Sequence, residues 1–152
     1  MSYKLGPAGG VGGSPYDAPY PTTPAAPGNP YAISAMKGRA GNRIDQIQVV
    51  WAGAGGGGES PPFGGNGGSP FRFDIPPGEW LAQIVGSVGA YDGSVRLFSI
   101  QFITNAGTLS GVYGKATSAA FSFQCPTNYV VTGIFGRADK EVDALGVYIA
   151  ST

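Results

Sequence analysis

Residues 41–50 read Gly41-Asn42-Arg43-Ile44-Asp45-Gln46-Ile47-Gln48-Val49-Val50, a short loop that ends in an aspartate and leads directly into an alternating segment. Ile47 and Val49 fall on one face of this segment and the two glutamines on the other, which is typical of a half-buried β-strand. The same order returns 98 residues later, where Asp139-Lys140-Glu141-Val142-Asp143 precedes Ala144-Leu145-Gly146-Val147-Tyr148-Ile149. The stretch is therefore one copy of a repeat.

A glycine-rich motif also occurs twice. The first copy is Gly9-Gly10-Val11-Gly12-Gly13-Ser14-Pro15-Tyr16, and the second, 55 residues later, is Gly64-Gly65-Asn66-Gly67-Gly68-Ser69-Pro70-Phe71. Two different motifs that are each repeated indicate internal symmetry. Weaker echoes, such as Phe121-Ser122-Phe123 after Phe71-Arg72-Phe73, divide the chain into three similar units of about fifty residues. We expect these units to surround a pseudo-threefold axis.

The composition favours strands over helices. Among 152 residues there are 27 glycines and 13 prolines, both of which interrupt helices, and the apolar residues are largely β-branched or aromatic. Many short alternating segments predict an all-β sandwich, barrel or prism, and the repeats favour three similar units arranged around an axis. One expected strand covers Trp80 to Val85, and we expect Gly86 to Gly93 after it to form a loop.

The third unit keeps the strands but lacks the polar residues of the other two. When the strands are aligned, Phe98 takes the place of Asp45 and Asp143. Ser118 takes the place of Gly13 and Gly68. Because this unit has the same strand pattern without them, the aspartates and glycines are not needed merely to build a unit. They are candidate binding residues.

An aspartate beside a glycine loop has the chemistry to bind a sugar. One fixed carboxylate accepts hydrogen bonds from two adjacent hydroxyl groups, and such charge-assisted bonds contribute ~1.5–3 kcal/mol each. Glycines let the chain turn so that backbone N–H groups point outward and donate to sugar oxygens. The alternative for either motif alone is a plain hairpin turn or a flexible loop, but their duplication in register favours binding.

The motifs together resemble the jacalin-related lectins, and most of all their mannose-specific branch. The resemblance covers nearly the whole chain except a proline-rich stretch, and it is carried by the segments Gly6–Gly13, Ile44–Val49, Phe63–Gly68 and Gly136–Tyr148. It implies an all-β fold, a β-prism I of three four-stranded Greek-key sheets, and a lectin that is not an enzyme. In the galactose-binding branch the chain is cleaved beside the sugar. Here it runs on through residues 1–13, which implies mannose or glucose.

The resemblance also implies two sugar sites in each chain. In the family, the aspartate side chain, the backbone N–H groups of two loop residues and one glycine-loop N–H hold the sugar. Carried over, one site comprises Asn42, Arg43, Asp45 and Gly68, and the other comprises Lys140, Glu141, Asp143 and Gly13. The second site has Asp139 where the first has Gly41. We expect strain in that loop, because aspartate adopts left-handed geometry less readily than glycine.

We expect a single lectin domain over residues 1–152, with a proline-rich loop insertion at residues 15–30. Prolines at positions 15, 19, 21, 24, 27 and 30 favour an extended, solvated connection over a packed element. The N-terminus shows no apolar signal-peptide segment, and no apolar run is long enough to cross a bilayer. We therefore expect no membrane insertion, and a protein that is cytoplasmic or released without a signal peptide.

Charge and residue content exclude several other functions. Nine Lys and Arg balance nine Asp and Glu, so the chain lacks the electrostatic footprint of a nucleic-acid-binding protein. It has no histidine, which excludes Ser-His-Asp and Cys-His catalysis and histidine metal sites, and its single cysteine, Cys125, excludes an internal disulfide. We expect it to bind mannose- or glucose-containing glycans and glycoproteins without a metal or cofactor, as a homodimer or homotetramer.

Two alternatives remain open from the sequence. Glu141 and Asp143 could in principle form the carboxylate pair of a glycoside hydrolase, although solvated loop charges are the simpler interpretation of two carboxylates beside a strand. The chain could also be a non-catalytic protein-interaction or structural β-prism module. Tyr16, Tyr20 and Tyr31, which lie among the prolines, would then supply contacts.

Overall fold

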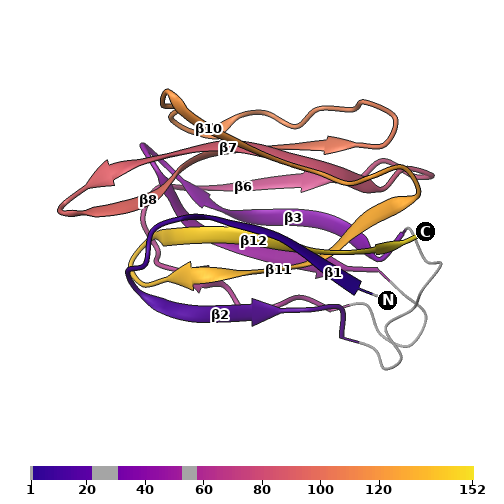
Figure 1. Cartoon of the computed structure of the whole chain (residues 1–152), viewed down its shortest axis with the longest axis horizontal. Helices are drawn as coiled ribbons and strands as arrows, with labels where there is room; N and C mark the ends of the chain where they lie inside the picture. Colours follow the sequence, from indigo (N-terminus) through magenta and orange to yellow (C-terminus); the bar gives the residue numbers. More distant parts are fainter. Residues whose placement is uncertain (1, 22–30, 53–57) are drawn as a thin grey trace.

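The computed structural model describes residues 2–21, 31–52 and 58–152, and every regular element in these residues is a β-strand (Figure 1). The strands in chain order are β1 (Ser2–Gly9), β2 (Ser14–Ala18), β3 (Ile33–Ala40), β4 (Ile44–Trp51), β5 (Phe63–Gly64), β6 (Ser69–Asp74), β7 (Leu81–Tyr91), β8 (Ser94–Thr104), β9 (Tyr113–Gly114), β10 (Ala119–Gln124), β11 (Tyr129–Ala138) and β12 (Val142–Ser151). The part of the chain that the structure describes contains no helix long and apolar enough to cross a membrane.

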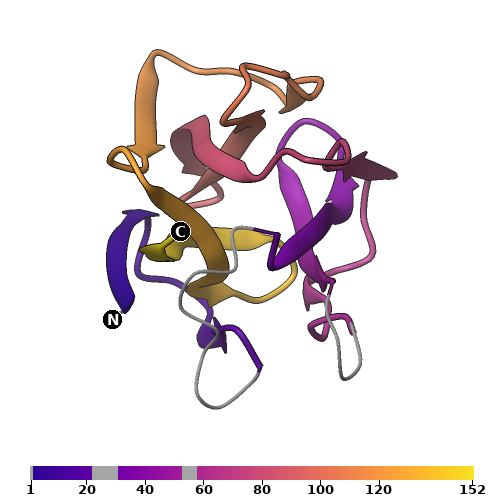
Figure 2. The same ribbon diagram turned by 90° about the vertical axis from the view of Figure 1, so that its right-hand side faces the viewer.

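The strands form three four-stranded antiparallel sheets that surround a common axis (Figure 2). Their orders are β1-β12-β11-β2, β5-β4-β3-β6 and β9-β8-β7-β10. In each sheet the two central strands, which are the longest, pair as a hairpin. The two edge strands of each sheet are consecutive in the chain. The predicted all-β prism with pseudo-threefold symmetry is confirmed.

The core lies between the three sheets. It is filled by the apolar side chains that occur at alternate positions along the strands. Ile47 and Val49 of β4 are fully buried, whereas the glutamines beside them are only half-buried. Aromatic rings join different sheets, since Phe71 of β6 stacks on Tyr113 of β9 with ring centroids 4.2 Å apart. The prediction that β4 is half-buried on one face is therefore confirmed.

β2 corrects part of the predicted proline-rich loop. Pro15 lies inside this strand, which pairs with β11 at the edge of the first sheet. Proline is tolerated in an edge strand because its missing N–H faces the open side. Tyr16 anchors the strand, because its ring is buried and its hydroxyl donates to the Ala144 carbonyl oxygen (2.9 Å). Residues 22–30 lie outside the described residues, so the remainder of that loop, like the single domain over 1–152, stays a prediction.

The hairpin between β7 and β8 corrects the loop expected over Gly86–Gly93. Strand β7 continues to Tyr91, and only Asp92 and Gly93 turn the chain. Both residues have positive φ, 50° and 81°, which is the geometry of the two-residue hairpin turn that Asp-Gly favours. The tip of this hairpin projects at the left of Figure 1.

Candidate functional site

Asp45 and Asp143 each occupy a β-bulge at the start of a central strand. Both sequence neighbours of Asp45 have partners in β3, whereas Asp45 itself has none. Asp143 is skipped in the same way between β11 and β12, and Phe98 is skipped between β7 and β8. A bulge turns its extra residue out of the ladder and is common beside binding sites. The three bulges also confirm the alignment of Phe98 with the two aspartates.

Each aspartate bulge holds a glycine loop through a backbone hydrogen bond. The N–H of Gly65 donates to the carbonyl oxygen of Asp45 (2.8 Å), and the N–H of Gly10 donates to that of Asp143 (2.9 Å). The glycine loop near the N-terminus therefore lies against the aspartate near the C-terminus, while residues 64–68 lie against Asp45. This is the pairing of motifs that the resemblance implied.

The last two glycines of each loop lie directly against the carboxylate. A Cβ added to Gly67 would stand 2.5 Å from Asp45 Oδ1, and one added to Gly68 would stand 2.7 Å from Oδ2. Gly68 and Gly13 also share a left-handed backbone, with φ of 65° and 66°. A side chain at these positions would strain the backbone and crowd the carboxylate. Glycine leaves the carboxylate oxygens accessible to a ligand.

Two arginines that the sequence analysis did not single out fix the glycine loops. Arg39 donates from Nε and Nη2 to the carbonyl oxygens of Gly67 and Gly68, at 3.0 and 2.9 Å. Arg137 makes the same two bonds to the other loop, at 2.9 and 2.8 Å. A planar guanidinium that holds two successive carbonyl groups sets the orientation of the loop. The sequence contained a signal, because each arginine lies six residues before its aspartate.

Both aspartates are buried as whole residues, with Asp45 9% and Asp143 4% exposed. Burial raises the pKa of each above the ordinary aspartate value, because a less polar environment disfavours the charged form. The charge of Glu141 raises both pKa values further, while Arg43 opposes the shift at Asp45 and Arg96 opposes it at Asp143. Neither carboxylate forms an ion pair within the described part of the chain.

A hollow of about 110 Å³ opens beside Asp143. Its lining consists of Gly12, Gly13, Ser94, Arg96, Asp139, Lys140 and Asp143. Three of the four residues predicted for this site thus share one hollow, and the β7–β8 hairpin of the neighbouring unit contributes a wall that the sequence did not reveal.

The fourth predicted residue, Glu141, does not line this hollow. Its carboxylate accepts two hydrogen bonds from Arg43, at 2.7 and 2.9 Å, and one from Arg96, at 3.2 Å. These residues occupy equivalent positions, each two residues before its bulge, so their side chains meet at the pseudo-threefold axis. Because their side chains are bound to each other, Arg43 and Glu141 can contact a ligand through their backbone groups and not through their side chains.

The strain expected at Asp139 is absent. Among the described residues other than glycine, positive φ occurs at Asp92 and Asn128, and Gly41 at the head of the other loop has no positive φ either. The loop heads make matching bonds, since the Gly41 and Asp139 N–H groups each donate to the carbonyl oxygen two residues on, at 3.0 and 2.9 Å. The expectation was wrong because this loop turns without left-handed geometry at its first residue.

The third unit has the same scaffold without the site. The N–H of Lys115 donates to the Phe98 carbonyl oxygen (2.9 Å), as the glycine loops do at the aspartate bulges. Phe98 supplies a ring in place of a carboxylate. Thr117 stands where the other loops have glycine, and its hydroxyl donates to the Val88 carbonyl oxygen (2.5 Å).

Comparison with known proteins agrees with this geometry. Residues 5–148 match the model of the jacalin-like lectin domain. The chain belongs to the jacalin-like lectin family. It is similar to horcolin of Hordeum vulgare, with 28% identity over 148 residues that make up 96% of this chain and 95% of horcolin. It is also similar to the jacalin-related lectin Calsepa of Calystegia sepium, with 32% identity over 120 residues, 79% of this chain and 71% of Calsepa.

Solved jacalin-related lectins share the whole fold. Wild-type Malaysian banana lectin aligns with a TM-score of 0.83 and 30% identity over 100% of both chains. A mannose binding jacalin-related lectin from Ananas comosus aligns with a TM-score of 0.83 and 28% identity over 99% of both chains. The family and the relatives found are lectins, which are non-catalytic carbohydrate-binding proteins, so this jacalin-like lectin is not the glycoside hydrolase considered above.

Proposed function

We propose that this jacalin-like lectin binds mannose- or glucose-type glycans at two sites in each chain, without a metal ion. One site comprises Asn42, Arg43, Asp45 and Gly68, and the other comprises Lys140, Glu141, Asp143 and Gly13. The observation that supports two sites is that two of the three units place an aspartate, at a β-bulge, against a glycine loop that an arginine holds in position. The mannose binding of the Ananas comosus lectin supports the choice of sugar.

The proposed chemistry uses a charged acceptor and neutral donors. Two adjacent sugar hydroxyls donate to the oxygens of one carboxylate, which forms no ion pair with any described residue and therefore keeps its accepting capacity. Backbone N–H groups of the aspartate loop and the glycine loop donate back to sugar oxygens. Because the carboxylate is buried, its hydrogen bonds act in a less polar medium than water and are stronger for that reason.

Metal independence rests on the same arrangement. Among the described residues, no group of three or more His, Cys, Asp or Glu side chains lies together to hold a metal ion, whereas a calcium ion takes six to eight oxygen ligands. Binding of methyl α-mannoside should therefore be unchanged when the protein is dialysed against EDTA. Loss of binding after this treatment, with recovery on addition of calcium, would contradict the proposal.

Titration calorimetry with methyl α-mannoside tests the two sites directly. We expect two sites in the natural chain, one in each of the variants Asp45→Asn and Asp143→Asn, and none in the double variant. Loss of a charged acceptor costs ~1.5–3 kcal/mol per bond, while an isolated monosaccharide site starts from only about −4 kcal/mol. The double variant should remain folded, because asparagine keeps the shape and removes two buried charges. Normal binding by a folded double variant would contradict the proposal.

A further inference from the structure

The glycine loop of the Asp45 site contains the only asparagine in the chain that precedes a glycine, in Asn66-Gly67. Asn66 is exposed, and among the described residues no hydrogen bond holds its side-chain amide. The glycine loop near the N-terminus has Val11 at this position, followed by Gly12. The two glycine loops therefore differ at this one residue, and only one of them has a side-chain amide beside a glycine.

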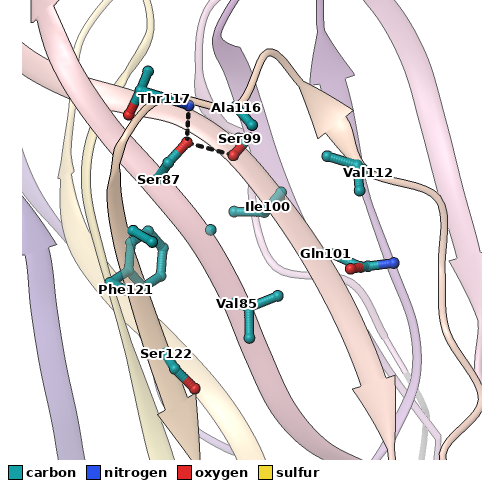
Figure 3. A pocket seen from close by; sticks show the side chains of 12 residues that line it. Val85, Ser87, Ser99, Ile100, Gln101, Val112, Ala116, Thr117, Phe121 and Ser122 are labelled. Atoms are coloured by element: carbon teal, nitrogen blue, oxygen red, sulfur yellow. Dashed lines mark hydrogen bonds between the residues drawn. The ribbon is translucent and has the colours of Figure 1, made fainter.

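The backbone N–H of Gly67 has no acceptor among the residues that the structure describes. Its counterpart in the third unit, the N–H of Thr117, donates to the hydroxyl oxygen of Ser87 (3.0 Å), as Figure 3 shows. The pairing with the edge strands shows that Ser87 has the position in β7 that Arg39 has in β3. A guanidinium has donors only, so Arg39 holds the carbonyl groups of its loop and cannot accept from Gly67.

An exposed asparagine before a glycine can react with the backbone of that glycine. The backbone nitrogen of Gly67 attacks the side-chain carbonyl carbon Cγ of Asn66, and the bond from Cγ to Nδ2 breaks. The proton of the Gly67 N–H leaves with Nδ2 as ammonia, and a cyclic imide remains. Water then opens the imide at one of its two carbonyl groups and yields aspartate or isoaspartate. Glycine favours the attack because no Cβ obstructs the approach.

We propose that Asn66 is a site of spontaneous deamidation, which removes the Asp45 sugar site and leaves the Asp143 site intact. This inference rests on the sugar sites proposed above and assigns a modification to one of them. Val11 has no amide, so the other loop cannot form the imide. With age the chain changes from two sites to one, without an enzyme.

Both products disturb the loop where it touches the carboxylate. Aspartate at position 66 adds a negative charge next to Gly67, where an added Cβ would stand 2.5 Å from Asp45 Oδ1. A like charge nearby disfavours the ionised form of Asp45, which is the acceptor for the sugar. Isoaspartate lengthens the backbone by one carbon. This shifts Gly67 and Gly68 away from the two hydrogen bonds that Arg39 donates, at 3.0 and 2.9 Å.

Ageing of the purified lectin in mildly alkaline buffer at physiological temperature tests the proposal, because base removes the Gly67 amide proton and speeds the attack. Peptide mass spectrometry locates the product, and methylation by an isoaspartyl methyltransferase identifies isoaspartate; neither measurement involves sugar. Titration calorimetry with methyl α-mannoside counts the sites in the same samples. Circular dichroism establishes that the aged protein is folded.

Two matched variants exchange the residues of the two loops. Asn66→Val gives the second glycine loop the residue that the first loop already carries, and Val11→Asn places an amide before Gly12. We expect Asn66→Val to keep both sites throughout ageing. We expect the double variant Val11→Asn/Asn66→Val to lose the Asp143 site and to keep the Asp45 site.

In the natural protein we expect conversion at Asn66, and a fall of at least about ten-fold in the affinity of the Asp45 site, as loss of one charge-assisted hydrogen bond would cause. If Asn66 stays intact in the folded chain while the unfolded chain converts under the same conditions, the proposal is overturned. A fully converted, folded chain that keeps both sites at full affinity would overturn it as well. Mass spectrometry tests the modification even if the chain binds no sugar, so failure of the proposed sugar sites is distinguishable from failure of this proposal.

Discussion

At the scale of single residues, Asp45 and Asp143 combine burial with the absence of an ion-pair partner among the described residues. A buried charge without a partner is unfavourable for folding, and the raised pKa of both groups expresses this cost. A group whose pKa is higher in the folded chain than in the unfolded chain stabilises the fold at low pH, and this contribution is lost as the pH rises through the folded pKa. At neutral pH the two carboxylates therefore weaken the fold that presents them.

The same shift predicts the pH dependence of sugar binding. Binding needs the ionised carboxylate as acceptor, so affinity for methyl α-mannoside should be full near neutral pH and should fall as the pH drops through a pKa above the ordinary aspartate value of about 3.9. Protonation of these two groups does not weaken the fold. Calorimetry and circular dichroism from pH 7 downward should show binding lost before structure. An affinity that stays constant until the protein unfolds would contradict this expectation.

At the scale of elements, we expect each proposed sugar site to depend on an arginine that does not touch the sugar. Arg39→Gln should weaken binding at the Asp45 site, because the carbonyl groups of Gly67 and Gly68 lose the two guanidinium hydrogen bonds that orient the loop. Each hydrogen bond from a charged donor contributes ~1.5–3 kcal/mol. Arg137→Gln should affect the Asp143 site alone, so each variant is the control of the other.

Calorimetry separates these two arginine variants by site when each is combined with the aspartate variant that removes the other site. Arg39→Gln in the Asp143→Asn background should bind at least ten-fold more weakly than that background. In the Asp45→Asn background, Arg39→Gln should have no effect. Equal weakening in both backgrounds would show that the arginine supports the fold as a whole and not one loop.

The elements also show where the sequence sufficed. Repeats at fixed offsets predicted the three units and the loss of polar residues around Phe98, and the resemblance to the jacalin-related lectins implied the pairing of each aspartate with its glycine loop. They did not predict the bulge at Asp45, because a bulge is a property of the register between two strands. They did not predict the role of Arg137, whose contact with Gly12 spans 125 residues. The loop predicted over Gly86–Gly93 was wrong, because the glycines of this segment indicated a loop more strongly than Asp92-Gly93 indicated a tight hairpin turn.

At the scale of the whole molecule, the two proposed sites of one chain would act as weak sites that are linked. Linking of sites raises avidity by ~10²–10⁴ when the geometry allows both to bind. Asp45→Asn should leave one site per chain, with its affinity for methyl α-mannoside unchanged. The minimum concentration of this variant for agglutination of mannose-bearing cells should rise at least ten-fold above that of the natural protein, because each particle presents fewer sites. Unchanged agglutination by a variant that calorimetry shows to have one site would contradict this.

The Asp143 site is closed by contacts between the two ends of the chain. Arg137 reaches Gly12 across 125 residues, whereas Arg39 reaches Gly67 across 28. The entropy lost in closing a loop grows with the logarithm of its length, so the longer closure costs roughly 1 kcal/mol more. During synthesis, the residues of the Asp45 site leave the ribosome close together. The first glycine loop, by contrast, can pair with Asp143 only after β12 has been made. We therefore expect a newly made chain to complete the two proposed sites one after the other, with the site that joins its ends formed last.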